Sequence, residues 1–293
     1  MFDRIIAIDW SARSRPASGR DSIWIAVDDG RDDGRDDGDG GDGGGSGPVA
    51  ENPPTRALAE AQLRRLVDGA IDRGDSVLIA IDVSLGYPAG TADALGLAAT
   101  SDDQPWAAMW RLLTTLIVDD PNNRNNRFAV AAELNRRISD GPGPFWGCPP
   151  STAGRTLTST KPASSSIAEW RRVEAVLRTR GRRPSSSWQL LGAGSVGSQS
   201  LLAIPVLERL RRTYPDVAVW PFEAPATVTI AEMWPSLLEP WPVAVRDEGQ
   251  VLAAAAFLRK TGTHALMAGV PIDVCDEEGW VLGVEPDQVP DDG

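Results

Sequence analysis

Two aspartates in this chain stand where short apolar segments end. Residues 4–8 (RIIAI) run into Asp9, and residues 76–81 (SVLIAI) run into Asp82. Carboxylate oxygens are the ligands that hard divalent cations prefer, and two carboxylates side by side can hold such an ion. The pair therefore predicts a metal site, provided that the two segments are neighbours in the folded chain.

Both segments have the composition of strands that are buried on both faces. They are short, nearly continuous and rich in isoleucine and valine, which is typical of central strands in a sheet covered by helices. An aspartate that closes such a strand lies at the carboxyl edge of the sheet, where open α/β folds place their ligands. We therefore expect Asp9 and Asp82 to meet at that edge.

The rest of the chain alternates between strand and helix patterns, as expected of an α/β protein. Further strands are expected near 22–27 and 48–51, and a helix with one apolar face begins at Pro53 and ends near Arg73. This helix precedes the strand that closes at Asp82. Later helix patterns cover 105–118, 127–138, 167–180, 199–212 and a segment that starts near Arg246, and later strand patterns cover 188–191, 217–222 and 227–233.

The length of 293 residues suffices for one large core, and we expect a single domain over residues 1–272. Residues 28–47 contain eight Asp, two Arg and many Gly. Such a composition cannot bury apolar surface and predicts a disordered loop insertion. Residues 273–293 are rich in acidic side chains and are expected to form a C-terminal tail.

Composition argues against several classes of protein. No apolar run approaches the roughly 18 residues of a membrane span, and no secretory signal pattern opens the chain, so we expect a cytoplasmic protein with no membrane partner. Two cysteines, Cys148 and Cys275, are too few for a disulfide framework or a metal cluster. The single histidine, His264, argues against a Ser-His-Asp site and against zinc bound by histidines.

Four segments carry a resemblance to a known family. They are residues 6–9 (IAID), 79–88 (IAIDVSLGYP), 230–235 (IAEMWP) and the alanine-rich helix pattern 247–256. Together they resemble the predicted RNase-H-like nucleases known as domain of unknown function number 429. The segment 79–88 is the most specific, because it matches the family's apolar-Asp-x-x-Leu-Gly-x-Pro motif. The resemblance implies a ribonuclease-H-like mixed five-stranded sheet flanked by helices, with extra helices and strands inserted.

The resemblance also implies a site. It assigns Asp9, Asp82, Glu232 and Asp247 as catalytic residues and as ligands of Mg²⁺ or Mn²⁺, with Asp9 bridging two ions, and it implies nucleic acid as a partner. Two metal ions held by such carboxylates activate water and stabilise the leaving oxygen in phosphoryl transfer. The chain differs from the family where Trp10-Ser11 follows the first aspartate, and where Gln250 and Val251 occupy the region of a second acid.

Other segments carry weaker signals. The net charge of −12 does not favour nucleic acid, but arginines cluster at 171–183 and 209–212, where they either track phosphates or form solvated helix faces. Residues 190–197 (LLGAGSVG) match the glycine-rich dinucleotide pattern, or form a turn where a helix approaches a strand closely. The polar run 122–127 either lines a substrate cleft or opens a helix, and Phe145-Trp146 either stacks on a base or packs into the core.

The leading hypothesis is therefore a metal-dependent phosphodiester hydrolase. A non-catalytic or regulatory binding module with the same fold is the main alternative, since a fold does not determine function. A phosphotransferase of the actin and sugar-kinase type is a third reading. It is less favoured, because Ser11 stands where that group usually has glycine.

Overall fold

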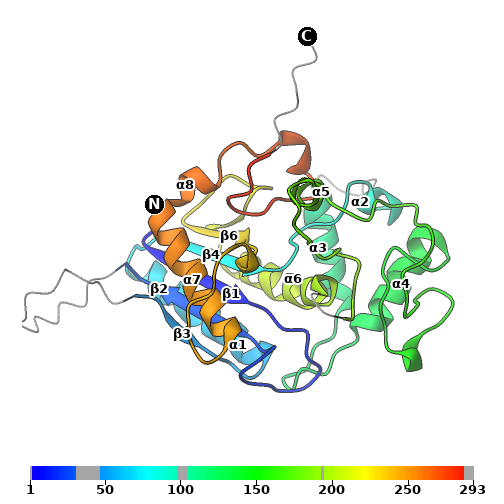
Figure 1. Ribbon diagram of the computed structural model, residues 1–293, viewed down its shortest axis with the longest axis horizontal. Coiled ribbons are helices and arrows are strands. Elements are labelled where there is room, and N and C mark those ends of the chain that lie inside the picture. Colours follow the sequence, from blue (N-terminus) through cyan, green and yellow to red (C-terminus); the bar gives the residue numbers. More distant parts are fainter. Residues whose placement is uncertain (1, 31–46, 98–103, 193–194, 287–293) are drawn as a thin grey trace, which may run out of the picture.

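The computed structural model describes residues 2–30, 47–97, 104–192 and 195–286, except for the side chain of His264. Within this part of the chain, one mixed sheet forms the centre of the molecule (Figure 1). Its strand order is β3-β2-β1-β4-β6-β5. The strands are β1 (Arg4–Asp9), β2 (Trp24–Asp28), β3 (Val49–Glu51), β4 (Val77–Asp82), β5 (Val217–Val219) and β6 (Val228–Glu232).

The two central strands are the two apolar segments that end in aspartate. β1 and β4 are parallel, and their register sets Ile8 beside Ile81 and Asp9 beside Asp82. β2 is antiparallel to β1 and β3 to β2, whereas β6 and β5 continue the parallel part of the sheet. Because β1 and β4 are covered on both faces, their residues are apolar almost without interruption until the terminal carboxylate.

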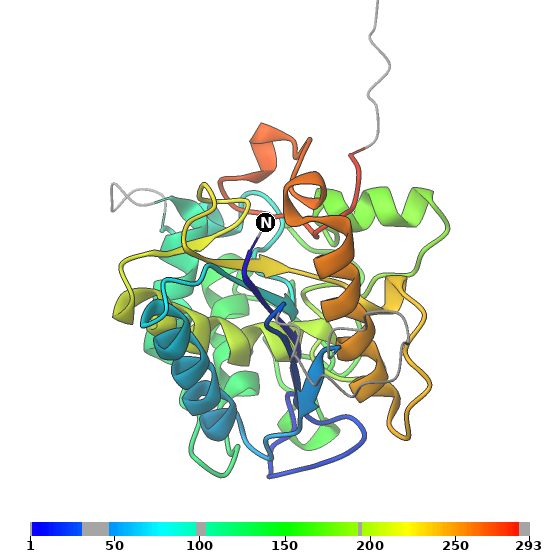
Figure 2. The ribbon, with the colours of Figure 1, turned by 90° about the vertical axis from the view of Figure 1, so that its left-hand side faces the viewer.

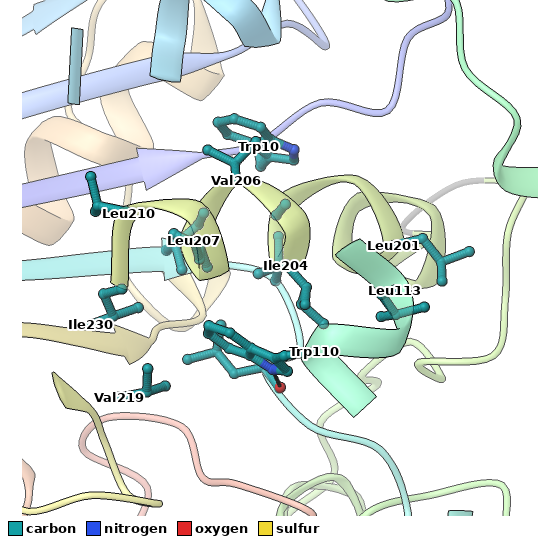
Figure 3. Packing of buried hydrophobic residues seen from close by; sticks show 14 of the residues in the cluster. Trp10, Trp110, Leu113, Leu201, Ile204, Val206, Leu207, Leu210, Val219 and Ile230 are labelled. Atoms are coloured by element: carbon teal, nitrogen blue, oxygen red, sulfur yellow. Dashed lines mark hydrogen bonds between the residues drawn. The ribbon is translucent and has the colours of Figure 1, made fainter. Parts of the chain in front are cut away.

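One face of the sheet packs against the larger group of helices. α1 (Arg56–Ile71), α3 (Pro105–Leu116), α4 (Arg127–Ser139) and α6 (Val196–Thr213) share a core with the side chains of Ile6, Ile8, Ile79 and Ile81. Figure 3 shows Ile204 and Leu207 of α6 between the strands and Trp110 of α3, with Trp10 at the end of β1.

The opposite face is covered by α7 (Arg246–Thr261), α5 (Arg172–Thr179) and the chain near residue 280. This second core contains the alternate strand residues, including Ala7 and Ala80, together with Trp280 and Leu282. In Figure 2, α1 (blue) and α7 (orange) lie on opposite sides of the strands. The shorter helices are α2 (Thr91–Ala94), α8 (Thr263–Leu266), η1 (Pro150–Thr152), η2 (Pro235–Leu237) and η3 (Ile272–Val274).

The α/β class expected from sequence is confirmed, but several elements differ. The sheet has six described strands, one more than the five-stranded core that the resemblance implies, and the patterns predicted at 217–222 and 227–233 form β5 and β6. The strand predicted at 188–191 is wrong, since only an isolated bridge from Trp146 to Gln189 forms there. The helix predicted at 167–180 is shorter and begins at Arg172.

The structure also bears on the predicted loop insertion and on the predicted C-terminal tail. Of the predicted loop insertion at 28–47, residues 31–46 lie outside the described part of the chain. Beyond residue 273 the chain does not leave the core at once, because Trp280, Val281, Leu282 and Val284 are buried in the second core. These apolar residues outweigh the acidic side chains around them, and only 287–293 lie outside the described residues. None of the described helices is long and apolar enough to span a bilayer.

Candidate functional site

Asp9 and Asp82 lie side by side at the carboxyl ends of β1 and β4. The register of the parallel strands pairs them directly, and neighbouring strands are about 4.8 Å apart. Both side chains are half-buried, and neither forms a hydrogen bond or an ion pair with any other residue that the structure describes. Two carboxylates are therefore held together without a described cation between them.

Burial raises the pKa of both carboxyl groups, and neighbouring carboxylates add to the rise. For Asp9, burial is the largest cause, and the charges of Asp82 and Asp247 come next. Asp21 adds a smaller effect, and the pKa of Asp9 lies well above the ordinary 3.8. For Asp82, burial and then the charge of Glu232 raise the pKa to about 7. A divalent cation between Asp9 and Asp82 would relieve this repulsion, because it compensates both charges.

Asp247 reaches the same edge from the first turn of α7. This helix packs over β1 and β2, and acidic residues in a first turn are stabilised by the helix dipole. The Oδ2 atom of Asp247 accepts a hydrogen bond of 2.6 Å from the backbone N–H of Asp21. Asp21 has a left-handed backbone with φ of 54°. The contact joins the turn before β2 to the start of α7 and leaves the other oxygen of Asp247 free of described donors.

Glu232 reaches the same edge of the sheet from the end of β6. β6 pairs with β4 so that Glu232 stands opposite Ile81, one residue before Asp82. Glu232 and Asp82 nevertheless line one cavity, and the charge of Glu232 acts on Asp82. Both oxygens of Glu232 already have donors: Arg171 at 2.6 and 2.7 Å and the N–H of Leu85 at 3.1 Å.

Arg171 is the centre of a buried charged cluster. Its guanidinium is fully buried and pairs with both Glu232 and Glu174, and its Nη1 also donates to the carbonyl of Glu278 at 2.9 Å. Burial opposes the charged form, but the two glutamates raise the pKa of Arg171 above its ordinary value. Burial raises the pKa of Glu232, and Arg171 opposes that rise. Glu232 therefore already has a cationic partner, whereas Asp9 and Asp82 have none among the described residues.

Two cavities open beside these carboxylates. One of about 540 Å³ is lined by Asp9, Asp21 and Asp247 together with the arginines Arg13 and Arg127. The other, of about 390 Å³, is lined by Asp82 and Glu232 with Arg183 and apolar side chains that include Trp234. Gln199 of α6 lines both, and its Nε2 donates to the carbonyl of Trp10. The aspartate pair at the sheet edge therefore faces two spaces that are large enough for a ligand.

The donor set determines which ions fit. Among the described residues, no group of three or more His, Cys, Asp or Glu side chains lies close enough to hold a metal ion. Two carboxylates with no cationic partner among the described residues nevertheless match the way in which Mg²⁺ is often bound, through one or two carboxylates with water and substrate oxygens as the remaining ligands. The pair Asp9 and Asp82 fits such an ion, whereas Glu232 would have to leave Arg171.

Sequence patterns missed Asp21 and Arg171 in this region, and they included Arg127 only within one of two alternatives. Asp21 lies in a polar turn without a motif, and Arg171 belonged to an arginine cluster interpreted as solvated or phosphate-binding. Arg127 is the last residue of the polar run 122–127, for which a substrate cleft is one interpretation. It lines the larger cavity. The backbone approach of 187–189 to Gly197 supplies a packing reason for the last glycine of the glycine-rich pattern.

Two other sequence candidates pack into the core. Phe145 is fully buried, and its ring meets Tyr87 and Trp188 edge-on at 5.8 and 4.8 Å. Cys148 is buried and Cys275 half-buried, and both are free thiols. None of these side chains lines the two cavities beside the aspartate pair.

Compared with known proteins, the chain matches no family model, no curated protein and no solved structure. What the carboxylate pair does must therefore be inferred from its geometry and chemistry.

Proposed function

We propose that this protein is a divalent-metal-dependent phosphodiester hydrolase of the ribonuclease-H-like type that acts on nucleic acid. The observation that carries the proposal is the pairing of Asp9 with Asp82 at the carboxyl edge of two parallel strands, with raised pKa values and no described cationic partner. Perturbed carboxyl groups in a cavity are typical of functional sites.

The order of the strands supports the proposed fold family. Three antiparallel strands come first in the chain, and the fourth returns parallel to the first and pairs beside it. This arrangement, with an acid on the first strand, an acid on the fourth and an acid opening a late helix, resembles the ribonuclease-H-like core. β6 then extends the sheet beside β4.

The residues divide into three roles in this proposal. Asp9 and Asp82 would hold Mg²⁺ or Mn²⁺ at the sheet edge, where such an ion would supply a more acidic water ligand and would compensate charge on a phosphate. Asp247, fixed by the N–H of Asp21, faces the same cavity and orients water or completes the ligand set. Glu232 keeps the assigned role of a ligand only if substrate or metal draws it from Arg171.

Binding of Mn²⁺ followed by calorimetry tests the metal site. The parent is expected to bind the ion at micromolar to millimolar concentration, and Asp9→Asn and Asp82→Asn are expected to lose most of that affinity. Asp216→Asn is the matched control, because Asp216 is an exposed aspartate before β5, at the opposite end of the parallel strands. A parent that binds no divalent ion at millimolar concentration contradicts the proposal.

The reaction needs a separate assay. Single- and double-stranded DNA and RNA are incubated with the parent and with the two aspartate variants in Mn²⁺. Cleavage by the parent and by Asp216→Asn, with loss in Asp9→Asn and Asp82→Asn, supports hydrolysis. Metal binding without cleavage of any substrate favours the alternative, a regulatory binding module. The pairing of Glu232 with Arg171 is the observation that favours that alternative.

A further inference from the structure

Three arginines are buried in the part of the chain that the structure describes: Arg56, Arg127 and Arg171. Two of them are neutralised by carboxylates. Arg56 pairs with both oxygens of Asp119 and also donates to backbone carbonyls, and Arg171 pairs with two glutamates. Neither of these two lines a cavity beside the aspartate pair.

Arg127 differs in both respects. It is 7% exposed and opens α4, and it pairs with no carboxylate of any described residue. Its acceptors are neutral: Nε donates to Ser198 Oγ at 2.9 Å, and Nη1 donates to Ser14 Oγ at 3.0 Å and to Asn125 Oδ1 at 2.8 Å. Asp119 acts on Arg127 only electrostatically and is itself paired with Arg56. A buried charge that has hydrogen bonds but no ion pair of its own is costly to keep, which points to a partner from outside the chain.

One nitrogen of Arg127 is available for that partner. Nη2 donates to no described acceptor, and it is not among the fully buried atoms that lack a partner. It therefore retains accessible surface, and Arg127 lines the 540 Å³ cavity. The guanidinium is also held by the ring of Phe128, 4.3 Å from the carbon Cζ. Its orientation is thus fixed before any ligand binds.

The surroundings of Arg127 favour an anion. Burial and the charge of Arg56 lower its pKa, and the charge of Asp119 opposes them in part. The resulting pKa of about 10 keeps Arg127 a cation at neutral pH. α6 begins at Val196, and the preceding Ser195 lines the same cavity. The N-terminus of a helix of this length carries partial positive charge, although the N–H of Gly197 in its first turn already donates to the carbonyl of Gln189. Asp9 and Asp247 line the same cavity, so the space is bounded by both acidic and basic side chains.

We propose that Arg127 binds a phosphate group of the substrate other than the one that reacts at Asp9. An acidic and a basic group in one cavity can hold two neighbouring phosphates of a single strand, the first through a metal ion and the second directly through the guanidinium. Ser14 and Ser198 orient the guanidinium for this contact. The inference deepens the proposed function and rests on it for the identity of the substrate.

Binding of inorganic phosphate in the presence of EDTA tests the subsite without any metal. The parent is expected to bind phosphate, with Arg127→Gln weakened by about 10- to 100-fold, because one charge-assisted contact is lost. Arg127→Lys is expected to keep part of the affinity. A parent that binds no phosphate, or a folded Arg127→Gln variant that binds it as tightly as the parent, overturns the proposal.

A second variant guards against misfolding of Arg127→Gln. Ser14 is exposed and its Oγ already contacts Nη1, so Ser14→Asp places a carboxylate on Arg127 without disturbing the core. It should abolish phosphate binding, whereas Ser18→Asp, an exposed change of the same charge, should not. Equal phosphate binding by both serine variants contradicts the subsite.

Kinetics separate this proposal from the hydrolase itself. On an oligonucleotide in Mn²⁺, Ser14→Asp should raise KM by at least about tenfold with kcat nearly unchanged, whereas Asp82→Asn should abolish turnover. Phosphate binding without Mn²⁺ binding would support the phosphate subsite and contradict the proposed hydrolase. Cleavage by Ser14→Asp with an unchanged KM would support the proposed hydrolase and contradict the phosphate subsite.

Discussion

Arg171 donates to both carboxylate oxygens of Glu232, 61 residues further along the chain, at 2.7 and 2.6 Å. The same guanidinium pairs with Glu174 in the first turn of α5. It thereby joins α5 to the end of β6 next to the candidate metal site. Two buried glutamates share one buried cation, so the cluster depends on Arg171 more than on either acid alone.

Replacing Arg171 with methionine should destabilise the protein by about 3–5 kcal/mol. The loss follows because Glu174 and Glu232 would remain buried without a cation and would have to be protonated or solvated. Urea denaturation measures the free energy of unfolding. The triple variant Arg171→Met, Glu174→Gln, Glu232→Gln should recover part of the loss, because no buried charge remains.

Arg172→Met is the matched control for this change. Its guanidinium is half-exposed and pairs with Asp273, whose side chain is two-thirds exposed. Surface pairs of this kind contribute about 0–1 kcal/mol. Equal losses in the free energy of unfolding for the two methionine variants would contradict the strong stabilisation that the geometry of the buried cluster implies.

The sequence predicts the paired aspartates for a simple physical reason. A strand buried on both faces is apolar throughout, so a single carboxylate at its end stands out, and β1 and β4 have the same pattern. Arg171 could not be found in this way, because its partners come from three separate segments. Nor could the pairing of Glu232 with Arg171, because these two residues are 61 positions apart and meet only in the folded chain.

Asp82→Asn should stabilise the metal-free protein at alkaline pH. In the folded chain the pKa of Asp82 is about 7, against 3.8 for an unperturbed aspartate. Since the folded state binds the proton more tightly, stability is highest below the lower value and is lost as the pH rises through about 7. Asparagine cannot ionise, so the variant should have a higher Tm than the parent in EDTA at about pH 8, by a few degrees.

Thermal unfolding at about pH 5 and about pH 8 measures this difference. The advantage of Asp82→Asn should shrink at the lower pH, where more of the parent is protonated, and Asp216→Asn should show no such dependence. Mn²⁺ at pH 8 should raise the Tm of the parent but not that of Asp82→Asn. A variant that is less stable than the parent at both pH values contradicts the raised pKa inferred for Asp82.

Close packing explains the glycine of the Leu-Gly-x-Pro sequence in segment 79–88. A Cβ atom at Gly86 would overlap the carbonyl oxygens of Glu277 and Glu278. The side chains of these glutamates in turn accept hydrogen bonds from the N–H groups of Ala89, Gly90 and Ala92. A late segment of the chain is therefore fixed against this loop, an approach that periodicity alone does not predict.

Gly86→Ala should consequently destabilise the protein by about 1–3 kcal/mol, since overlap with backbone atoms cannot be relieved by a rotamer change. The displaced carbonyl of Glu278 is also an acceptor of Arg171, so the damage should extend to the buried cluster. Urea denaturation measures the effect. Gly154→Ala is the control, because a Cβ there meets no atom within 4 Å, and it should change stability by less than about 0.5 kcal/mol. Equal stability of the two alanine variants would show that residues 277–278 can move away from Gly86 without cost.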